Sequence, residues 1–235
     1  MSDSTPSQSA GPASRRQFLQ QVGGAAGLAA LAVTGCDSNG GMSNDTPETV
    51  TLDFSDDFGV LDYAYALEQL EAAFYATATA NFYGDLSSAE GQYFRDIAAH
   101  EGIHRDFFAT AIPALGGELI PDLEVDFSGI DFNNRDQVLS TAKLLEDTGV
   151  SAYNGAGIFL EDPELLAVAG KIVSVEARHA ASVRSLVNPG SADFAGNDVV
   201  DPQTGLDVST APSNVLSAVA DTGLVTTQLE VTNVS

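Results

Sequence analysis

The sequence contains very few basic residues. Only nine lysines and arginines stand against 33 aspartates and glutamates, so the formal net charge is −24. Lys143 and Lys171 are the only lysines. A surface with this excess of carboxylates repels nucleic acid and anionic lipid headgroups, and we expect neither as a partner. The excess of acid resembles proteins from salt-rich habitats, where high ionic strength screens the repulsion between like charges.

Cysteine is almost absent as well. Cys36 is the single cysteine, so the chain cannot form an internal disulfide bond. The apolar run 22–34 is too short to span a bilayer. With 235 residues and 44% hydrophobic side chains, the chain can still build one core domain with extensions.

The first 36 residues have the features of an export signal. Arg15 and Arg16 precede Phe-Leu and the apolar run 22–34, an order that resembles the twin-arginine motif for export of folded proteins. The tetrapeptide Val-Thr-Gly-Cys that ends at Cys36 resembles a lipobox, in which cleavage leaves the cysteine as a lipidated N-terminus. We therefore expect a cell-envelope lipoprotein, periplasmic or on the outer cell surface, that contacts the membrane only through its lipid anchor.

The rest of the chain predicts an all-α fold after a tether. Residues 37–55 are rich in Ser, Asn, Gly and Asp, which predicts a flexible tether. Apolar residues then recur at three- and four-residue steps, and capping signals divide them into successive helices. The expected helices cover residues 56–81, from the capping box at 87–90 to about 115, from 133 to about 160 and from 163 to about 187, with a short fifth helix at 212–220 in the extension 188–235.

The segment between the second and third helices is too long for a tight turn. Residues 116–132 contain Pro121 and Gly129 and lack a helical pattern. We interpret this segment as one long crossover that runs the length of a four-helix bundle at residues 56–187. Two antiparallel hairpins joined in this way form the ferritin-like connectivity among helical bundles.

Each expected helix of the bundle carries a glutamate that is followed, at a fixed spacing, by a histidine or a tyrosine. Two of the three histidines follow a glutamate by three residues, and two tyrosines follow a glutamate by seven. Both spacings place the pair on one face of a helix. Four carboxylates in one bundle core are too costly without a compensating cation, so the pattern predicts a metal site. In chain order the pairs are Glu68 with Tyr75, Glu101 with His104, Glu146 with Tyr153, and Glu176 with His179.

This pattern resembles the ferritin-like di-iron carboxylate superfamily, which includes bacterioferritin and rubrerythrin. Within it, the chain is similar to exported bacterial ferritin-like domain proteins related to desiccation-related proteins. The resemblance implies that Glu68 and Glu146 each serve mainly one metal ion, while Glu101 and Glu176 bridge both. It further implies that His104 and His179 bind one ion apiece and that the hydroxyls of Tyr75 and Tyr153 orient carboxylates across the bundle.

Carboxylate and imidazole ligands favour two Fe or Mn ions, and no organic cofactor is evident. One hypothesis is an iron oxidase or a peroxide-consuming oxidase that uses O2 or peroxide. The alternative is a non-catalytic ferritin-like module that protects against stress or desiccation. A homo-oligomer is compatible with either, whereas a lipid tether and an acidic loop fit poorly with a closed storage cage.

Some positions have competing interpretations. Glu71, one turn after Glu68, is an alternative ligand, and Asp147 competes with Glu146. His100 is expected to be an ordinary, partly exposed histidine that points away from Glu101. Gly102 disfavours a helix, and we expect it to allow a close approach of helices around the metals.

Overall fold

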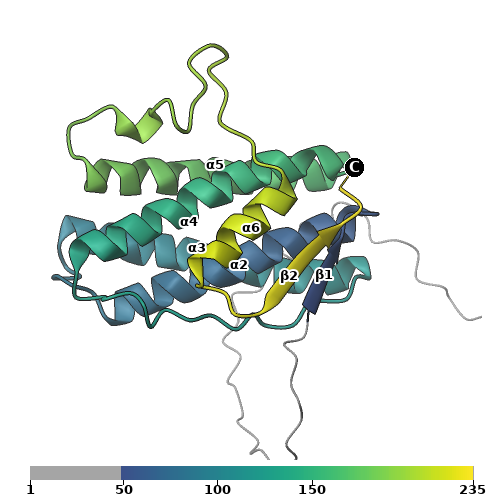
Figure 1. Ribbon diagram of the computed structural model, residues 1–235, viewed down its shortest axis with the longest axis horizontal. Coiled ribbons are helices and arrows are strands. Elements are labelled where there is room, and N and C mark those ends of the chain that lie inside the picture. The colour runs from purple at the N-terminus through teal and green to yellow at the C-terminus, as the bar shows by residue number, and fades with distance from the viewer. Residues whose placement is uncertain (1–48, 235) are drawn as a thin grey trace, which may run out of the picture. The chain divides into compact units, whose positions relative to one another are not determined.

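Four long helices run side by side through the computed structural model, which describes residues 49–234 (Figure 1). Their bounds lie close to the predicted ones, and the predicted all-α four-helix bundle is confirmed. The helices are α2 (Asp57–Ala80), α3 (Ala89–Leu115), α4 (Arg135–Ala156) and α5 (Pro163–Val187).

Polar side chains cap the beginnings of the four helices. The side chains of Asp56, Ser88, Asn134 and Asp162 each accept a hydrogen bond from a backbone N–H in the first turn of α2, α3, α4 and α5. Helix α4 ends four residues earlier than predicted, because the chain tightens there into the 3₁₀ turn η1 (Gly157–Phe159).

The connection between α3 and α4 carries the chain back along the whole bundle, as predicted. Arg135 at the start of α4 forms an ion pair with Glu90 at the start of α3, with Nε 2.8 Å from Oε1. At the other end, the Asp57 carboxylate at the start of α2 accepts hydrogen bonds from the backbone of Glu161 and Asp162, beyond α4. Helices α2 and α4 are therefore antiparallel, which places their matching residues opposite one another.

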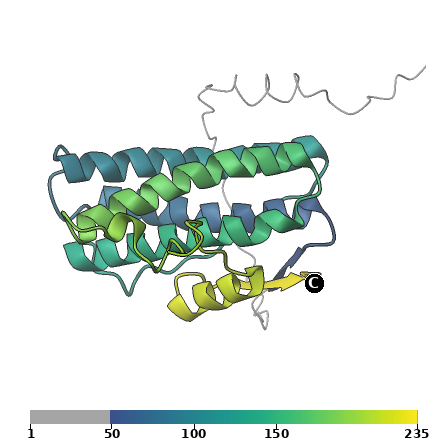
Figure 2. The same cartoon turned by 90° about the horizontal axis from the view of Figure 1, so that it is seen from above.

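Two short strands join the ends of the described chain, a feature that the sequence analysis missed. Strand β1 (Thr49–Asp53) pairs in parallel with β2 (Gln228–Thr232). The predicted tether 37–55 is therefore wrong for its last part, because the alternating pattern of β1 buries Leu52 completely. The predicted fifth helix is α6 (Pro212–Thr222), and Figure 2 shows α6 and β2 together on one side of the bundle.

The bundle core has apolar layers around a polar middle. Large side chains such as Phe74, Phe94 and Ile112 are completely buried, and so are several glutamates.

None of the helices within residues 49–234 is long and apolar enough to cross a membrane. The predicted signal with Arg15, Arg16 and Cys36, and the tether up to residue 48, lie outside the described residues.

Candidate metal centre

Four glutamates and two histidines meet in the middle of the bundle. The glutamates are completely buried, and the histidines are 9% and 5% exposed. On α3 and α5 the expected three-residue spacing directs a glutamate and a histidine to one face of the helix. The six residues are Glu68 from α2, Glu101 and His104 from α3, Glu146 from α4, and Glu176 and His179 from α5.

The imidazole of His104 faces three of these carboxylates with its Nδ1 atom. This atom lies 2.8 Å from Oε1 of Glu176, 3.4 Å from Oε2 of Glu68 and 3.5 Å from Oε2 of Glu101. It is buried and makes no hydrogen bond of regular geometry. The ring therefore directs a nitrogen, rather than a carbon edge, into the centre.

His179 repeats this arrangement on the other half of the bundle. Its Nδ1 atom lies 2.7 Å from Oε1 of Glu101, 3.6 Å from Oε2 of Glu146 and 3.7 Å from Oε2 of Glu176. Glu101 and Glu176 thus approach both histidines, whereas Glu146 approaches His179 alone, as Glu68 approaches His104 alone.

The donor atoms form two overlapping groups that are each compact enough to hold one metal ion. Within a group, one donor atom from each residue lies within 4.8 Å of all the others. Glu101 and Glu176 belong to both groups. The first group adds Glu68 and His104, and the second adds Glu146 and His179.

Two tyrosines bind the outer oxygens of the unshared glutamates. The hydroxyl of Tyr75 on α2 donates to Oε1 of Glu146 on α4 over 2.5 Å. The hydroxyl of Tyr153 on α4 donates to Oε1 of Glu68 on α2. Each tyrosine therefore crosses to the opposite helix, and each carboxylate keeps its second oxygen for the centre.

All six residues of the centre contain buried polar atoms that have no hydrogen-bond partner. Buried atoms without a hydrogen-bond partner include Oε2 of Glu68 and Glu146, both carboxylate oxygens of Glu101 and Glu176, and Nδ1 of both histidines. Native proteins rarely bury so many polar atoms without partners, because each loses its hydration. Hard oxygen donors with two imidazole nitrogens suit Fe or Mn, so these residues fit such ions.

The electrostatics of the centre indicate a shortage of positive charge. Burial raises the pKa of Glu68 and of Glu146 well above the ordinary value, and neighbouring carboxylates contribute. Burial alone lowers the pKa of His104, but the nearby carboxylates of Glu101, Glu176 and Glu68 outweigh burial and raise it to about 12. In the same way the pKa of His179 rises to about 10. A cation bound between these carboxylates would favour their charged form and would take the place of the protons on the histidines.

The alternative positions differ in what surrounds their side chains. Glu71 is buried but belongs to neither group of four donors, whereas Glu68 belongs to the first group. Asp147 is directed to Arg184, with Oδ1 2.7 Å from Nε, and takes no part in either group. At Gly102 an added Cβ atom meets nothing within 4 Å, so the expectation of a close helix approach there is wrong.

His100 has a partner that sequence reasoning missed. The residue is exposed, as expected, but its Nδ1 atom lies 2.9 Å from Nε2 of His179 and the two rings stack. The outer nitrogen of His179 is thereby occupied, while its inner nitrogen faces the carboxylates. The four-residue spacing between His100 and His104 was the available signal, because it places both on one side of α3.

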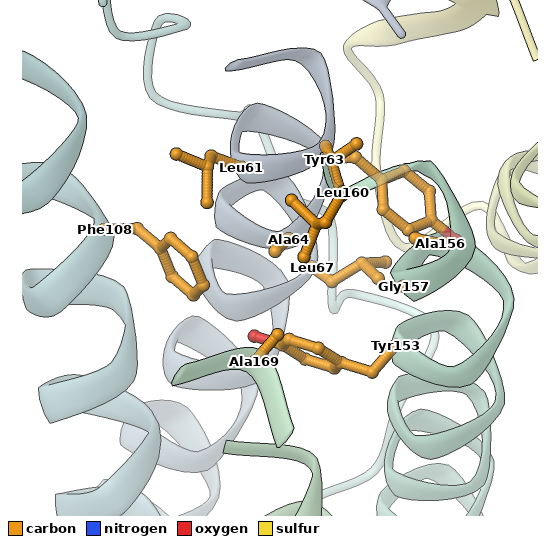
Figure 3. A pocket seen from close by; sticks show the side chains of 11 residues that line it. Leu61, Tyr63, Ala64, Leu67, Phe108, Tyr153, Ala156, Gly157, Leu160 and Ala169 are labelled. Atoms are coloured by element: carbon orange, nitrogen blue, oxygen red, sulfur yellow. The ribbon is translucent and has the colours of Figure 1, made fainter. Parts of the chain in front are cut away.

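A small apolar cavity lies next to Tyr153. Its volume is about 20 Å³, enough for roughly one water-sized molecule. Figure 3 shows the Tyr153 ring reaching from α4 across one end of the cavity, below Leu67 and opposite Phe108. Tyr153 therefore lines the cavity and also contacts the centre, since its hydroxyl donates to Glu68.

The comparisons with known proteins agree with the fold. Residues 56–189, more than half of the chain, match the family described as "Ferritin-like domain". The match covers α2 to α5 and every residue of the centre. No curated protein matches the chain.

Proposed function

The chain belongs to the ferritin-like domain family, and on that basis we propose that it holds two iron or manganese ions between its four long helices. The observation that carries this proposal is the set of buried, unpartnered donor atoms described above. Two divalent ions match four carboxylates in charge. Glu68 and His104 serve one ion, Glu146 and His179 serve the other, and Glu101 and Glu176 are shared.

The surroundings of the centre suit redox chemistry on a small molecule. When bound, a pair of ferrous ions supplies two electrons, the number that reduces one peroxide molecule with two protons to two waters. The chain contributes the rest: the hydroxyls of Tyr75 and Tyr153 hold the unshared carboxylates in place. The cavity beside Tyr153, with a volume of about 20 Å³ and a mostly apolar lining, offers space for a diatomic molecule. We therefore propose oxidation of ferrous iron by O2 or peroxide as the activity.

Metal analysis and an oxidation assay test this proposal in sequence. Purified protein loaded with Fe²⁺ or Mn²⁺ and freed of excess metal is expected to retain two ions per chain. With Fe²⁺ and O2 or peroxide, it is expected to consume ferrous iron faster than a Glu101→Ala/Glu176→Ala variant. The matched control is Glu118→Ala/Glu124→Ala, which removes two exposed glutamates of the crossover and is expected to behave as the unaltered protein.

The outcomes separate the two functional classes. Fewer than one ion per chain would favour the non-catalytic protective module. Two ions without oxidation above the Glu101→Ala/Glu176→Ala variant would retain the metal centre and remove the oxidase activity.

We also propose that the protein works outside the cytoplasm on a lipid anchor. The support is the order of Arg15-Arg16, the apolar run and Cys36 in the sequence. Cell fractionation tests this: the protein is expected in the membrane fraction, and Cys36→Ala is expected to move it to a soluble fraction. Equal distribution of both forms would contradict the anchor.

A further inference from the structure

A fifth buried glutamate lies beside the centre and is not used by either group of donors. Glu71 stands one turn after Glu68 on α2 and is 2% exposed. Its Oε2 atom is buried and has no hydrogen-bond partner. A carboxylate in this position needs an explanation, because an apolar side chain would fill the space without the cost of lost hydration.

The opposite helix leaves room for this carboxylate. A Cβ atom added at Gly149 on α4 would lie 2.9 Å from Oε1 of Glu71 and 3.5 Å from its Oε2. Glycine is a poor helix former, and Gly149 is buried in the interior of α4. The glycine therefore has a steric reason to be there, and that reason is Glu71.

The internal repeat of the chain singles out the same two positions. Glu68 and Tyr75 on α2 correspond to Glu146 and Tyr153 on α4. Each tyrosine donates a hydrogen bond to the glutamate on the other helix. Glu71 follows Glu68 by three residues, and the residue three after Glu146 is Gly149. Helices α2 and α4 therefore contribute alike to the centre except for one added carboxylate on α2 and the space for it on α4.

The charges around Glu71 indicate what it faces. Burial raises its pKa well above the ordinary value, and the carboxylates of Glu176, Glu101, Glu146 and Glu68 raise it further, in that order. Glu71 is thus close enough to interact with all four glutamates of the centre. Positive charge placed among those four glutamates would also favour the charged form of Glu71.

We propose that Glu71 is a seventh protein ligand of the metal centre, accommodated by the missing side chain of Gly149. The proposal rests on the proposed function, since it requires that the centre binds metal. It assigns five carboxylates to the ions and makes the two halves of the centre unequal. The α2 side then supplies two carboxylates, whereas the α4 side supplies one.

Titration with Mn²⁺ in the absence of oxidant tests the proposal on the full chain. We expect Glu71→Gln to weaken Mn²⁺ binding about tenfold or more, since even residues that only support ligands cost tenfold or more in affinity. In the metal-free state we expect Glu71→Gln to melt no lower than the unaltered protein, because it removes an uncompensated acid. The melting temperature should then rise less with Mn²⁺ in the variant.

Two control substitutions make the result specific. Asp62→Asn also removes one carboxylate of α2, whose pKa burial raises to about 6, but Asp62 belongs to neither group of donors. It is expected to leave Mn²⁺ affinity unchanged. Gly149→Ala is expected to weaken binding without touching a ligand, whereas Gly170→Ala, where an added Cβ atom has open space, is not. In the Gly149→Ala background, Glu71→Gln should have little further effect.

Different results of the Mn²⁺ titration would contradict this proposal and the proposed function. If the unaltered protein binds two Mn²⁺ ions and Glu71→Gln binds them equally well, Glu71 is not a ligand. A lower melting temperature of Glu71→Gln with and without metal, at unchanged affinity, would likewise assign it a structural role. If the unaltered protein binds no metal, both proposals are overturned.

Discussion

Three buried tyrosines of the bundle differ in what their hydroxyls contact. Tyr75 and Tyr153 donate to glutamates on the opposite helix. The hydroxyl of Tyr63 is buried just as deeply but has no hydrogen-bond partner. The three side chains thus offer a comparison in which the same atom is removed from equally buried rings.

We expect Tyr75→Phe and Tyr153→Phe each to lower the free energy of unfolding by about 1–2 kcal/mol, because each leaves a buried carboxylate oxygen without its donor. Each should also weaken Mn²⁺ binding by about tenfold, since the carboxylate loses its orientation. Tyr63→Phe is expected not to lower the free energy of unfolding, because no hydrogen bond is lost and a buried hydroxyl without a partner is removed. Urea unfolding and Mn²⁺ titration measure both effects. Equal costs for all three variants would show that the hydroxyl contacts are not responsible.

For single residues, the sequence predicted which side chains share a helix face better than it predicted which side chains meet between helices. The spacing of Glu101 to His104 and of Glu176 to His179 indicated which side chains share a helix face, because that geometry is local. The contact of His100 with His179, and of Glu71 with Gly149, depends on how two helices are placed against each other. Such placement is not encoded within one helix, so neither contact could be predicted from the sequence.

At the scale of elements, local signals again account for what could be predicted. Apolar periodicity and capping residues located α2 to α5, because both signals come from residues within or next to each helix. The pairing of β1 with β2 was missed because the strands have five residues each and lie at opposite ends of the described chain. Nothing in the sequence of either strand identifies its partner.

One buried arginine fastens the segment after α5 to the bundle. Arg184 is 3% exposed and binds Asp147 on α4 through Nε and Nη2. It also binds Asp198 and the backbone oxygen of Asp193, both in the segment between α5 and α6. This side chain therefore connects three parts of the fold through one guanidinium group.

We expect Arg184→Met to lower the free energy of unfolding by about 2–3 kcal/mol, because several charge-assisted hydrogen bonds are lost while most of the apolar stem is kept. The segment 188–211 should also become more sensitive to limited proteolysis. Arg178→Met, which removes an exposed arginine of the same helix, is expected to stay within about 0.5 kcal/mol. If Arg184→Met leaves the proteolysis of segment 188–211 unchanged, other contacts hold that segment on the bundle.

For the molecule as a whole, the net charge of −24 predicts a dependence on salt. Repulsion between exposed carboxylates opposes folding at low ionic strength, and the screening length falls from about 10 Å at 0.1 M salt to about 3 Å at 1 M. We therefore expect the metal-free protein to melt at a higher temperature, and to refold more completely, as NaCl rises from low to molar concentration. Near pH 4, where about half of the carboxylates are protonated, the same increase in salt should have a smaller effect. Sulfate is avoided because it strengthens apolar burial regardless of charge. Equal stability at low and molar NaCl at pH 7 would show that the acidic surface does not limit folding.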